Sequence, residues 1–265
     1  MAYFIFIIIY ATMANPEKNI DLDYWYTEWE KQQNALISMR QERFDFMLDV
    51  MESRFSGKIT ALDLGCGPGS FSRRFLERFP DGKVTAIDYD PVQLKIFRET
   101  FKSSQVEILE RDLRSDSWDS GIATGTYNVI FSTTALHWLP TSRLRVAYKK
   151  IYHLLSTEGI FLDGDHFRAN NTPKKIEDIY TFIKDRYQKN GLGSGAMDWD
   201  QWWNNLRRTG WAADLFQIRD QRFGTGGHDE KVSMEDHVQF LKDAGFSIID
   251  FPWKYTNNMV LLAMV

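Results

Sequence analysis

The chain has 265 residues, of which 43% are hydrophobic and 26% charged, and its formal net charge is -4 at pH 7. These ordinary values exclude a disordered, collagenous or multi-span membrane protein. The acidic balance gives no general attraction to nucleic acid. The single cysteine, Cys66, excludes an internal disulfide and a cysteine-rich zinc site, and it indicates a reducing compartment, the cytoplasm.

The chain opens with an apolar run over residues 2–10, AYFIFIIIY. This run is shorter than the roughly 20 residues that a membrane-spanning helix needs. No Lys or Arg precedes Lys18, so the basic start of a signal peptide is missing. We therefore interpret residues 1–12 either as an extension ahead of a start at Met13 or as a segment tucked against the body, and we expect no membrane association.

A helix is predicted from Tyr24 to Met51, because large apolar residues recur there every three or four positions. Short apolar runs then alternate with helical patterns. The predicted strands cover residues 60–64, 84–87, 106–109, 128–131 and 160–163, and the predicted helices cover residues 70–79, 90–101 and 142–155. Repeated β–α units predict an α/β fold, a Rossmann-like doubly wound sheet that is mostly parallel and has helices on both faces.

The alternation stops after Asp165. Residues 166–232 contain four of the nine Trp and at least two helical patterns, near 174–189 and 198–208, which predict a helical cap. A helix over 233–244 follows, and then two antiparallel strands over 246–251 and 258–264 that bring the sheet to seven strands. The stretch Pro252-Trp253-Lys254 is predicted to form the turn between them.

These patterns divide the chain into four parts. The predicted parts are an N-terminal segment with lid helices (1–57), a Rossmann-like core (58–165), a cap insertion for the substrate (166–232), and a C-terminal helix and strand pair that completes the core (233–265).

A glycine-rich turn, LDLGCGPGS over residues 62–70, joins the first predicted strand to the next helix. Glycines permit a tight turn and a close approach of a ligand to the backbone. The helix that follows offers unpaired N–H groups. The segment therefore predicts a nucleotide-like ligand at the carboxyl end of this strand, with a plain strand-to-helix turn as the alternative.

Acidic residues end the next two predicted strands. The carboxylate of Asp88 is placed to accept hydrogen bonds from both hydroxyls of a ribose, and Asp112 is placed to accept one from an adenine amine. A solvated loop charge is the alternative reading of Asp112. Together with the glycine-rich turn, these two strand ends are predicted to bind the methionine, ribose and adenine parts of one ligand.

At this point the sequence resembles the class I S-adenosylmethionine-dependent methyltransferases, in the small-molecule branch that includes trans-aconitate methyltransferase. The D-x-G-x-G-x-G signature corresponds to Asp63, Gly65, Gly67 and Gly69, and residues 132–139, STTALHWL, match the segment after the fourth strand. The resemblance covers residues 58–165 well, residues 233–265 less well, and the cap barely. Residues 154–159, LLSTEG, lack the Lys-Pro turn that the family often has there.

The resemblance implies S-adenosylmethionine as the cofactor and S-adenosylhomocysteine as the product. It implies that Gly65, Cys66 and Gly67 cradle the methionine end and that Asp63 holds its ammonium group. Asp88 would bind the ribose, Tyr89 would pack on the adenine, and Asp112 and Leu113 would read the adenine edge. The backbone at Thr133 would approach the cofactor. For Cys66, a small side chain that fits a crowded turn is the alternative.

Methyl transfer needs a general base only if the acceptor must lose a proton. His137, after the fourth predicted strand, is the candidate base, and a structural role in the pocket wall is its alternative. The predicted substrate pocket comprises Tyr24, Trp25, Trp138, His166, Arg168 and Trp203. The favoured acceptor is an oxygen of a small molecule, followed by nitrogen and then carbon.

Other readings remain open. A dinucleotide-dependent oxidoreductase would use Gly65, Gly67 and Ser70 with Asp88, but it does not explain Asp63, Gly69 and Asp112. A methyltransferase acting on protein or nucleic acid and a non-catalytic binding protein are further alternatives.

We expect no metal, because no acid after the fourth predicted strand complements Asp163 and Asp165. The protein is expected to be a monomer or a homodimer.

Overall fold

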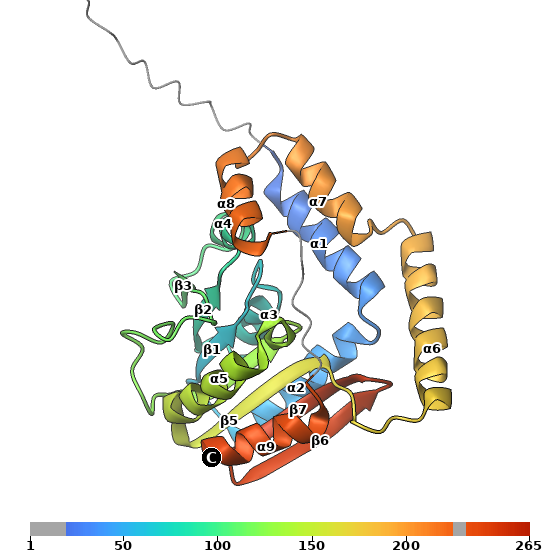
Figure 1. Ribbon diagram of the computed structural model, residues 1–265. Coiled ribbons are helices and arrows are strands. Elements are labelled where there is room, and N and C mark those ends of the chain that lie inside the picture. Colours follow the sequence, from blue (N-terminus) through green and yellow to red (C-terminus); the bar gives the residue numbers. More distant parts are fainter. Residues whose placement is uncertain (1–19, 225–231) are drawn as a thin grey trace, which may run out of the picture.

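The computed structural model describes residues 20–224 and 232–265, so the apolar run and the predicted extension over residues 1–12 lie outside it (Figure 1). The strands are β1 (Thr60–Leu64), β2 (Lys83–Asp88), β3 (Val106–Glu110), β4 (Tyr127–Thr133), β5 (Leu155–His166), β6 (Ile248–Tyr255) and β7 (Asn258–Met264). The helices are α1 (Leu22–Leu36), α2 (Arg40–Arg54), α3 (Ser70–Arg78), α4 (Pro91–Thr100), α5 (Thr141–Leu154), α6 (Lys174–Gly193), α7 (Trp199–Arg208), α8 (Ala213–Phe223) and α9 (Met234–Ala244), with a short 3₁₀ helix η1 (Leu136–Trp138).

The described strands form one seven-stranded sheet in the order β3-β2-β1-β4-β5-β7-β6. The strands from β1 to β5 are parallel to their neighbours, and β7 runs antiparallel to both β5 and β6. This confirms the predicted fold class. Because parallel strands end at the same edge, the segments that follow β1, β2, β4 and β5 converge there.

Apolar side chains cover both faces of the sheet. One core cluster packs residues of α2, α3 and α4 on the sheet, and the other packs residues of α5 and α9 on the opposite face. Alternate residues of a strand point to opposite faces, which is why Leu62 and Leu64 join the second cluster while Ala61 joins the first.

The predicted single helix over Tyr24–Met51 is wrong, because the chain turns between α1 and α2. Met39 adopts a left-handed conformation with φ 57°, which interrupts a right-handed helix. The side chain of Asn258 holds this turn from β7 by donating from Nδ2 to the carbonyl oxygen of Ser38 at 2.5 Å.

The predicted Pro-Trp-Lys turn is also wrong. Pro252 lies inside β6, where the pairing with β7 shifts register between Asp250 and Trp253. A proline without an N–H is tolerated at such an irregularity on an edge strand. The chain reverses instead at Thr256, with φ 56°, and Asn257.

In its described part, residues 166–224 and 232, the predicted cap has three helices, one more than the two that the sequence located. Figure 1 shows α7 and α8 beside α1, and α6 at the edge of the molecule. Aromatic rings of α1, α7, α8 and the loop between α7 and α8 form a buried group that we call the cap cluster. Its large members are Trp25, Trp29, Trp202, Trp203, Trp211 and Phe216.

Trp202 lies at the centre of the cap cluster. It is fully buried, its ring centre is 5.0 Å from that of Trp29 and 4.9 Å from that of Trp203, and its indole N–H donates to the carbonyl oxygen of Trp25. Edge-on contacts of this kind stabilise beyond the area that they bury.

We expect Trp202→Ala to lower the free energy of unfolding by about 3–5 kcal/mol, because it opens a large cavity. Urea denaturation measures this change. Trp199→Ala is the matched control, since that ring is 40% exposed on the same helix and its loss should cost far less. Equal losses in the two variants would contradict the central role of Trp202.

Candidate active site

The glycine-rich turn has no room for side chains at two of its positions. Gly65 and Gly69 have φ angles of 75° and 84°. A Cβ on Gly65 would lie 2.2 Å from the Cβ of Ala135, and one on Gly69 would lie 2.3 Å from the ring of Phe97. The turn after β1 therefore packs directly against the segment that leads from β4 to η1.

Asp88 fastens this turn to the end of β2. Its carboxylate accepts hydrogen bonds from the backbone N–H groups of Gly67 at 2.7 Å, Tyr89 at 2.7 Å and Asp90 at 2.8 Å. Burial raises the pKa of Asp88 to about 6. A carboxylate offers about four acceptor positions, so Asp88 has room for one further donor, whereas two ribose hydroxyls were predicted.

Asp63 and Cys66 are buried under the turn. Asp63 accepts a hydrogen bond from the hydroxyl of Ser72 at 2.6 Å, and burial raises its pKa to about 7. Burial also raises the pKa of the Cys66 thiol, with the nearby charges of Asp88 and Asp63 adding to the effect. Because a raised pKa keeps the thiol protonated and unreactive, it supports the interpretation that Cys66 is a packing residue.

Asp112 is occupied by a neighbour. Arg114 donates from Nε to Oδ1 at 2.8 Å and from Nη2 to Oδ2 at 2.9 Å. Although partial burial opposes it, this ion pair holds the pKa of Asp112 below its usual value. Arg114 also lies 5.3 Å from the centre of the Tyr89 ring, so an adenine at Asp112 would have to share the site with a guanidinium. Leu113 packs against the apolar core on the α5 side.

The sequence analysis missed the contribution of α8 to this region. Arg219 donates to Asp90 at 2.6 Å, and Arg222 donates both to the carbonyl oxygen of Tyr89 at 2.7 Å and to Glu110 at 2.6 Å. The cap thus contacts the segment that follows β2 and the last residue of β3. The only sequence signal was a pair of arginines three positions apart on an unassigned helix.

His137 and Asp165 form a hydrogen-bonded pair at the ends of β4 and β5. Nδ1 of His137 lies 2.8 Å from Oδ2 and 3.0 Å from Oδ1 of Asp165, and the backbone N–H of His166 donates to Oδ1 at 2.7 Å. Although burial opposes it, the charges and hydrogen bonds of His137 and His166 hold the pKa of Asp165 well below its usual value. The exposed ring of Trp138 lies beside the imidazole, with centroids 5.4 Å apart.

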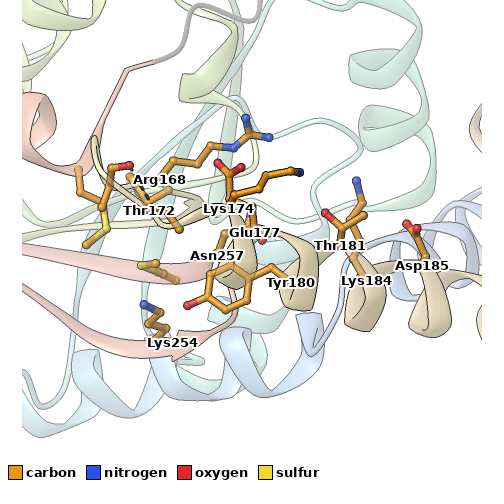
Figure 2. Close-up of a pocket in the computed structure, with 14 residues that line it drawn as sticks. Arg168, Thr172, Lys174, Glu177, Tyr180, Thr181, Lys184, Asp185, Lys254 and Asn257 are labelled. Atoms are coloured by element: carbon orange, nitrogen blue, oxygen red, sulfur yellow. Dashed lines mark hydrogen bonds between the residues drawn. The ribbon is translucent and has the colours of Figure 1, made fainter.

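The structure separates the predicted pocket residues into four places. His166 and Trp138 lie beside the His137–Asp165 pair, and Thr133 ends β4 just before it. Tyr24 is exposed on α1. Trp25 and Trp203 do not line an open wall, because both rings are buried in the cap cluster. Arg168 lines a separate cavity beside α6 (Figure 2).

Over residues 20–224 and 232–265, no group of three or more His, Cys, Asp or Glu side chains is arranged to hold a metal ion. Within the same ranges, no helix is both long enough and apolar enough to cross a membrane.

Asp63→Asn is expected to stabilise the protein at high pH. The pKa of Asp63 is about 7 in the folded protein and has the ordinary value of 3.8 in the unfolded chain. Because the unfolded chain loses this proton first, the free energy of unfolding falls as the pH rises from 3.8 to about 7. Asn carries no charge to bury. We expect a melting temperature at least about 4 °C above that of the unsubstituted protein at pH 8, and no such gain at pH 4.

Thermal unfolding followed by circular dichroism at both pH values measures this effect. Asp81→Asn, at an exposed loop position, is the control and should leave the difference between pH 4 and pH 8 unchanged. An Asp63→Asn protein no more stable than the unsubstituted protein at pH 8 would contradict the cost assigned to the buried charge.

Comparison with known proteins identifies the domain. Residues 61–159 match the family model described as a methyltransferase domain. A malonyl-[acyl-carrier protein] O-methyltransferase of Acetivibrio thermocellus is 25% identical over 130 residues, which cover 49% of this chain and 44% of the relative. A trans-aconitate 2-methyltransferase of Azoarcus is 33% identical over 81 residues, covering 31% and 29%. The chain therefore spans less than half the length of these relatives.

A solved structure described as a putative S-adenosyl-L-methionine-dependent methyltransferase from Methanococcus maripaludis shares the fold. It matches with a TM-score of 0.54 at 14% identity, over 95% of this chain and 96% of the other. Residues 61–159 therefore match a methyltransferase domain, and the strand order and the glycine-rich turn established above are similar to those of the class I S-adenosylmethionine-dependent methyltransferases.

Proposed function

We propose that this protein transfers a methyl group from S-adenosylmethionine to an oxygen atom of a small-molecule acceptor, with His137 as the general base. The observation that carries the proposal is the His137–Asp165 pair, which lies at the end of β4. Two residues before His137, Ala135 packs against Gly65 of the glycine-rich turn. The candidate base and the candidate cofactor turn therefore belong to one packed unit.

The residues around the turn suit the cofactor. The first turn of α3 has no side-chain cap, because its N-cap is Gly69, and its N–H groups suit the carboxylate of a methionine moiety. Asp63 suits the ammonium group, and the remaining acceptor position of Asp88 suits a ribose hydroxyl. When bound, S-adenosylmethionine supplies a methyl group that is already electrophilic.

The protein then has to position the acceptor and manage its proton. A carboxylate at Nδ1 favours the tautomer in which Nδ1 carries the hydrogen, so the lone pair of the neutral imidazole is on Nε2. Nε2 is the atom that would take a proton from an acceptor hydroxyl. Asp165 would stabilise the imidazolium that results.

A carboxylate oxygen is the second candidate acceptor. The relatives are named for malonyl-[acyl-carrier protein] and trans-aconitate, and both names denote acids. A carboxylate acceptor has no proton to lose near neutral pH, so His137 would then only orient it. Nitrogen acceptors and macromolecular substrates are weaker alternatives, because no described feature favours them.

The cellular location and assembly state are proposals as well. The single cysteine supports a cytoplasmic protein. A monomer or a homodimer remains our expectation.

Cofactor affinity is expected to fall at low pH. Because the pKa of Asp88 is raised to about 6, its carboxyl becomes protonated below that pH and loses an acceptor position for the ribose. We expect the dissociation constant for S-adenosylhomocysteine to rise about tenfold between pH 7.5 and pH 5. Isothermal titration calorimetry measures it.

Asp88→Asn should weaken binding and reduce this pH dependence, while Asp81→Asn should change neither. NADH should not bind. Binding of NADH without binding of S-adenosylhomocysteine would support the dinucleotide-dependent oxidoreductase instead, and equal affinity at both pH values would contradict the role of Asp88.

The base is tested by His137→Asn. For a hydroxyl acceptor we expect kcat to fall about 10²–10⁴-fold with little change in cofactor affinity. The assay follows formation of S-adenosylhomocysteine during a screen of small-molecule acceptors. His153→Asn, an exposed histidine on α5, is the control and should keep full activity. An unchanged kcat in the His137 variant with a hydroxyl acceptor would remove the base from the mechanism, whereas an unchanged kcat is expected for a carboxylate acceptor.

A further inference from the structure

A cavity of about 310 Å³ lies between the first half of α6 and the ends of β5, β6 and β7 (Figure 2). Its α6 wall is a single stripe of that helix, since the lining positions recur at helical spacing. These positions are Lys174, Glu177, Tyr180, Thr181, Lys184 and Asp185. At a rise of about 1.5 Å per residue, this wall is about 16 Å long, so the cavity suits an elongated molecule.

Within the described residues, the hydrogen bonds between α6 and the rest of the protein lie in the C-terminal half of the helix. Tyr187 and Gln188 donate to backbone oxygens of Asn34 and Leu36, and Gly191 packs tightly on Ala35. None of the 20 residues of α6 is buried. Its first half therefore stands away from the strands, at the edge of the molecule in Figure 1.

The lining is rich in cations. Arg168, Lys184 and Lys254 face the cavity, and none of their charged groups lies within 4.0 Å of a carboxylate in the described part of the chain. Lys254 lies 5.8 Å from the centre of the Tyr180 ring. This is a local excess of positive charge on a chain whose net charge is -4.

The remaining charges of the lining are mixed. Lys174 is paired with Asp178 at 2.7 Å, and Glu177 and Asp185 are the acidic lining residues. Four basic side chains thus face two acidic ones, which favours an anionic occupant.

Neither His137 nor Asp165 lines the cavity, but neighbours of Asp165 do. Met259 lines it and is the cross-strand partner of Asp165 in the β5–β7 pairing. Cross-strand partners point to the same face and lie about 5 Å apart. Phe167 and Arg168, also in the lining, follow Asp165 by two and three positions in the chain.

We propose that this cavity binds an anionic group, a carboxylate or a phosphate, at the far end of an elongated acceptor whose reacting oxygen lies at His137. Arg168, Lys184 and Lys254 recognise the charge. The assignment of the occupant as acceptor rests on the proposed methyl transfer, whereas binding of an anion in the cavity does not.

The test uses citrate and inorganic pyrophosphate as probes, titrated calorimetrically into the full chain at low ionic strength. We expect the double variant Lys184→Gln/Lys254→Gln to raise the dissociation constant of the preferred probe at least about tenfold. Lys189→Gln removes the same charge from α6 outside the cavity and should leave binding unchanged. Preference for citrate assigns a carboxylate, and preference for pyrophosphate assigns a phosphate.

Lysine acetylation with acetic anhydride gives an independent readout. The bound probe should protect the amines of Lys184 and Lys254, but not that of Lys189, by mass spectrometry. Absence of binding by either probe at concentrations up to about 10 mM would overturn the proposal. Equal binding by the double variant and the unsubstituted protein would also overturn it.

S-adenosylhomocysteine is titrated into the same samples to separate the two proposals. Anion binding without S-adenosylhomocysteine binding would keep the anion site and remove the methyl transfer on which its role as an acceptor site rests. The reverse result would overturn the anion site alone, since the cavity variants should leave S-adenosylhomocysteine affinity unchanged.

Discussion

The carboxylate of Asp88 is the contact on which the arrangement of the site depends. By accepting the N–H groups of Gly67, Tyr89 and Asp90, it joins the turn after β1 to the turn after β2. Gly65 of the glycine-rich turn also packs on Ala135, which lies two residues before His137. The half-buried carboxylate of Asp88 and the close contact between Gly65 and Ala135 thus set the spacing of three strand ends.

The cap is coupled to the same loops. Arg219 and Arg222 of α8 contact the segment after β2 and the end of β3, and Arg219 also lies 3.7 Å from the ring centre of Trp203. The aromatic packing of α1, α7 and α8 is therefore continuous with the residues that surround the candidate cofactor site. A change in the cap cluster would alter the packing of Arg219 on Trp203 and therefore the contact of Arg219 with Asp90.

The sequence was sufficient for the parts of the molecule that local pattern determines. Apolar runs bounded by turn residues located five parallel strands, and the spacing of Gly65, Gly67 and Gly69 located the turn. Contacts between distant segments were not accessible in this way. The break at Met39 depends on Asn258, more than 200 positions away, and the apolar period continues across it.

The same limit applies to the site. Asp112 was correctly placed after β3, but its ion pair with Arg114 occupies carboxylate oxygens that were predicted to accept a hydrogen bond from an adenine amine. Trp25 and Trp203 were placed near a pocket because aromatic residues line pockets, yet these rings also pack on one another. Composition alone does not separate these two uses of a tryptophan.

The charge state of the candidate base pair follows from the order of residues along β5. Asp163 and Asp165 point to the same face because they are two positions apart. Burial, with the neighbouring charge of Asp165, raises the pKa of Asp163 well above its usual value, and neither of its oxygens has a hydrogen-bond partner among the described residues. Asp165 instead contacts His137 and His166, which hold its pKa low.

Two carboxyl groups this close do not both ionise at low cost, so the environment assigns the negative charge to one of them. That one is Asp165, the group in contact with the imidazole. With the two environments exchanged, a neutral acid would face Nδ1 and either tautomer of His137 would be accommodated. The distribution of charge along one strand therefore favours the tautomer with its lone pair on Nε2, which is the tautomer that the proposed mechanism requires.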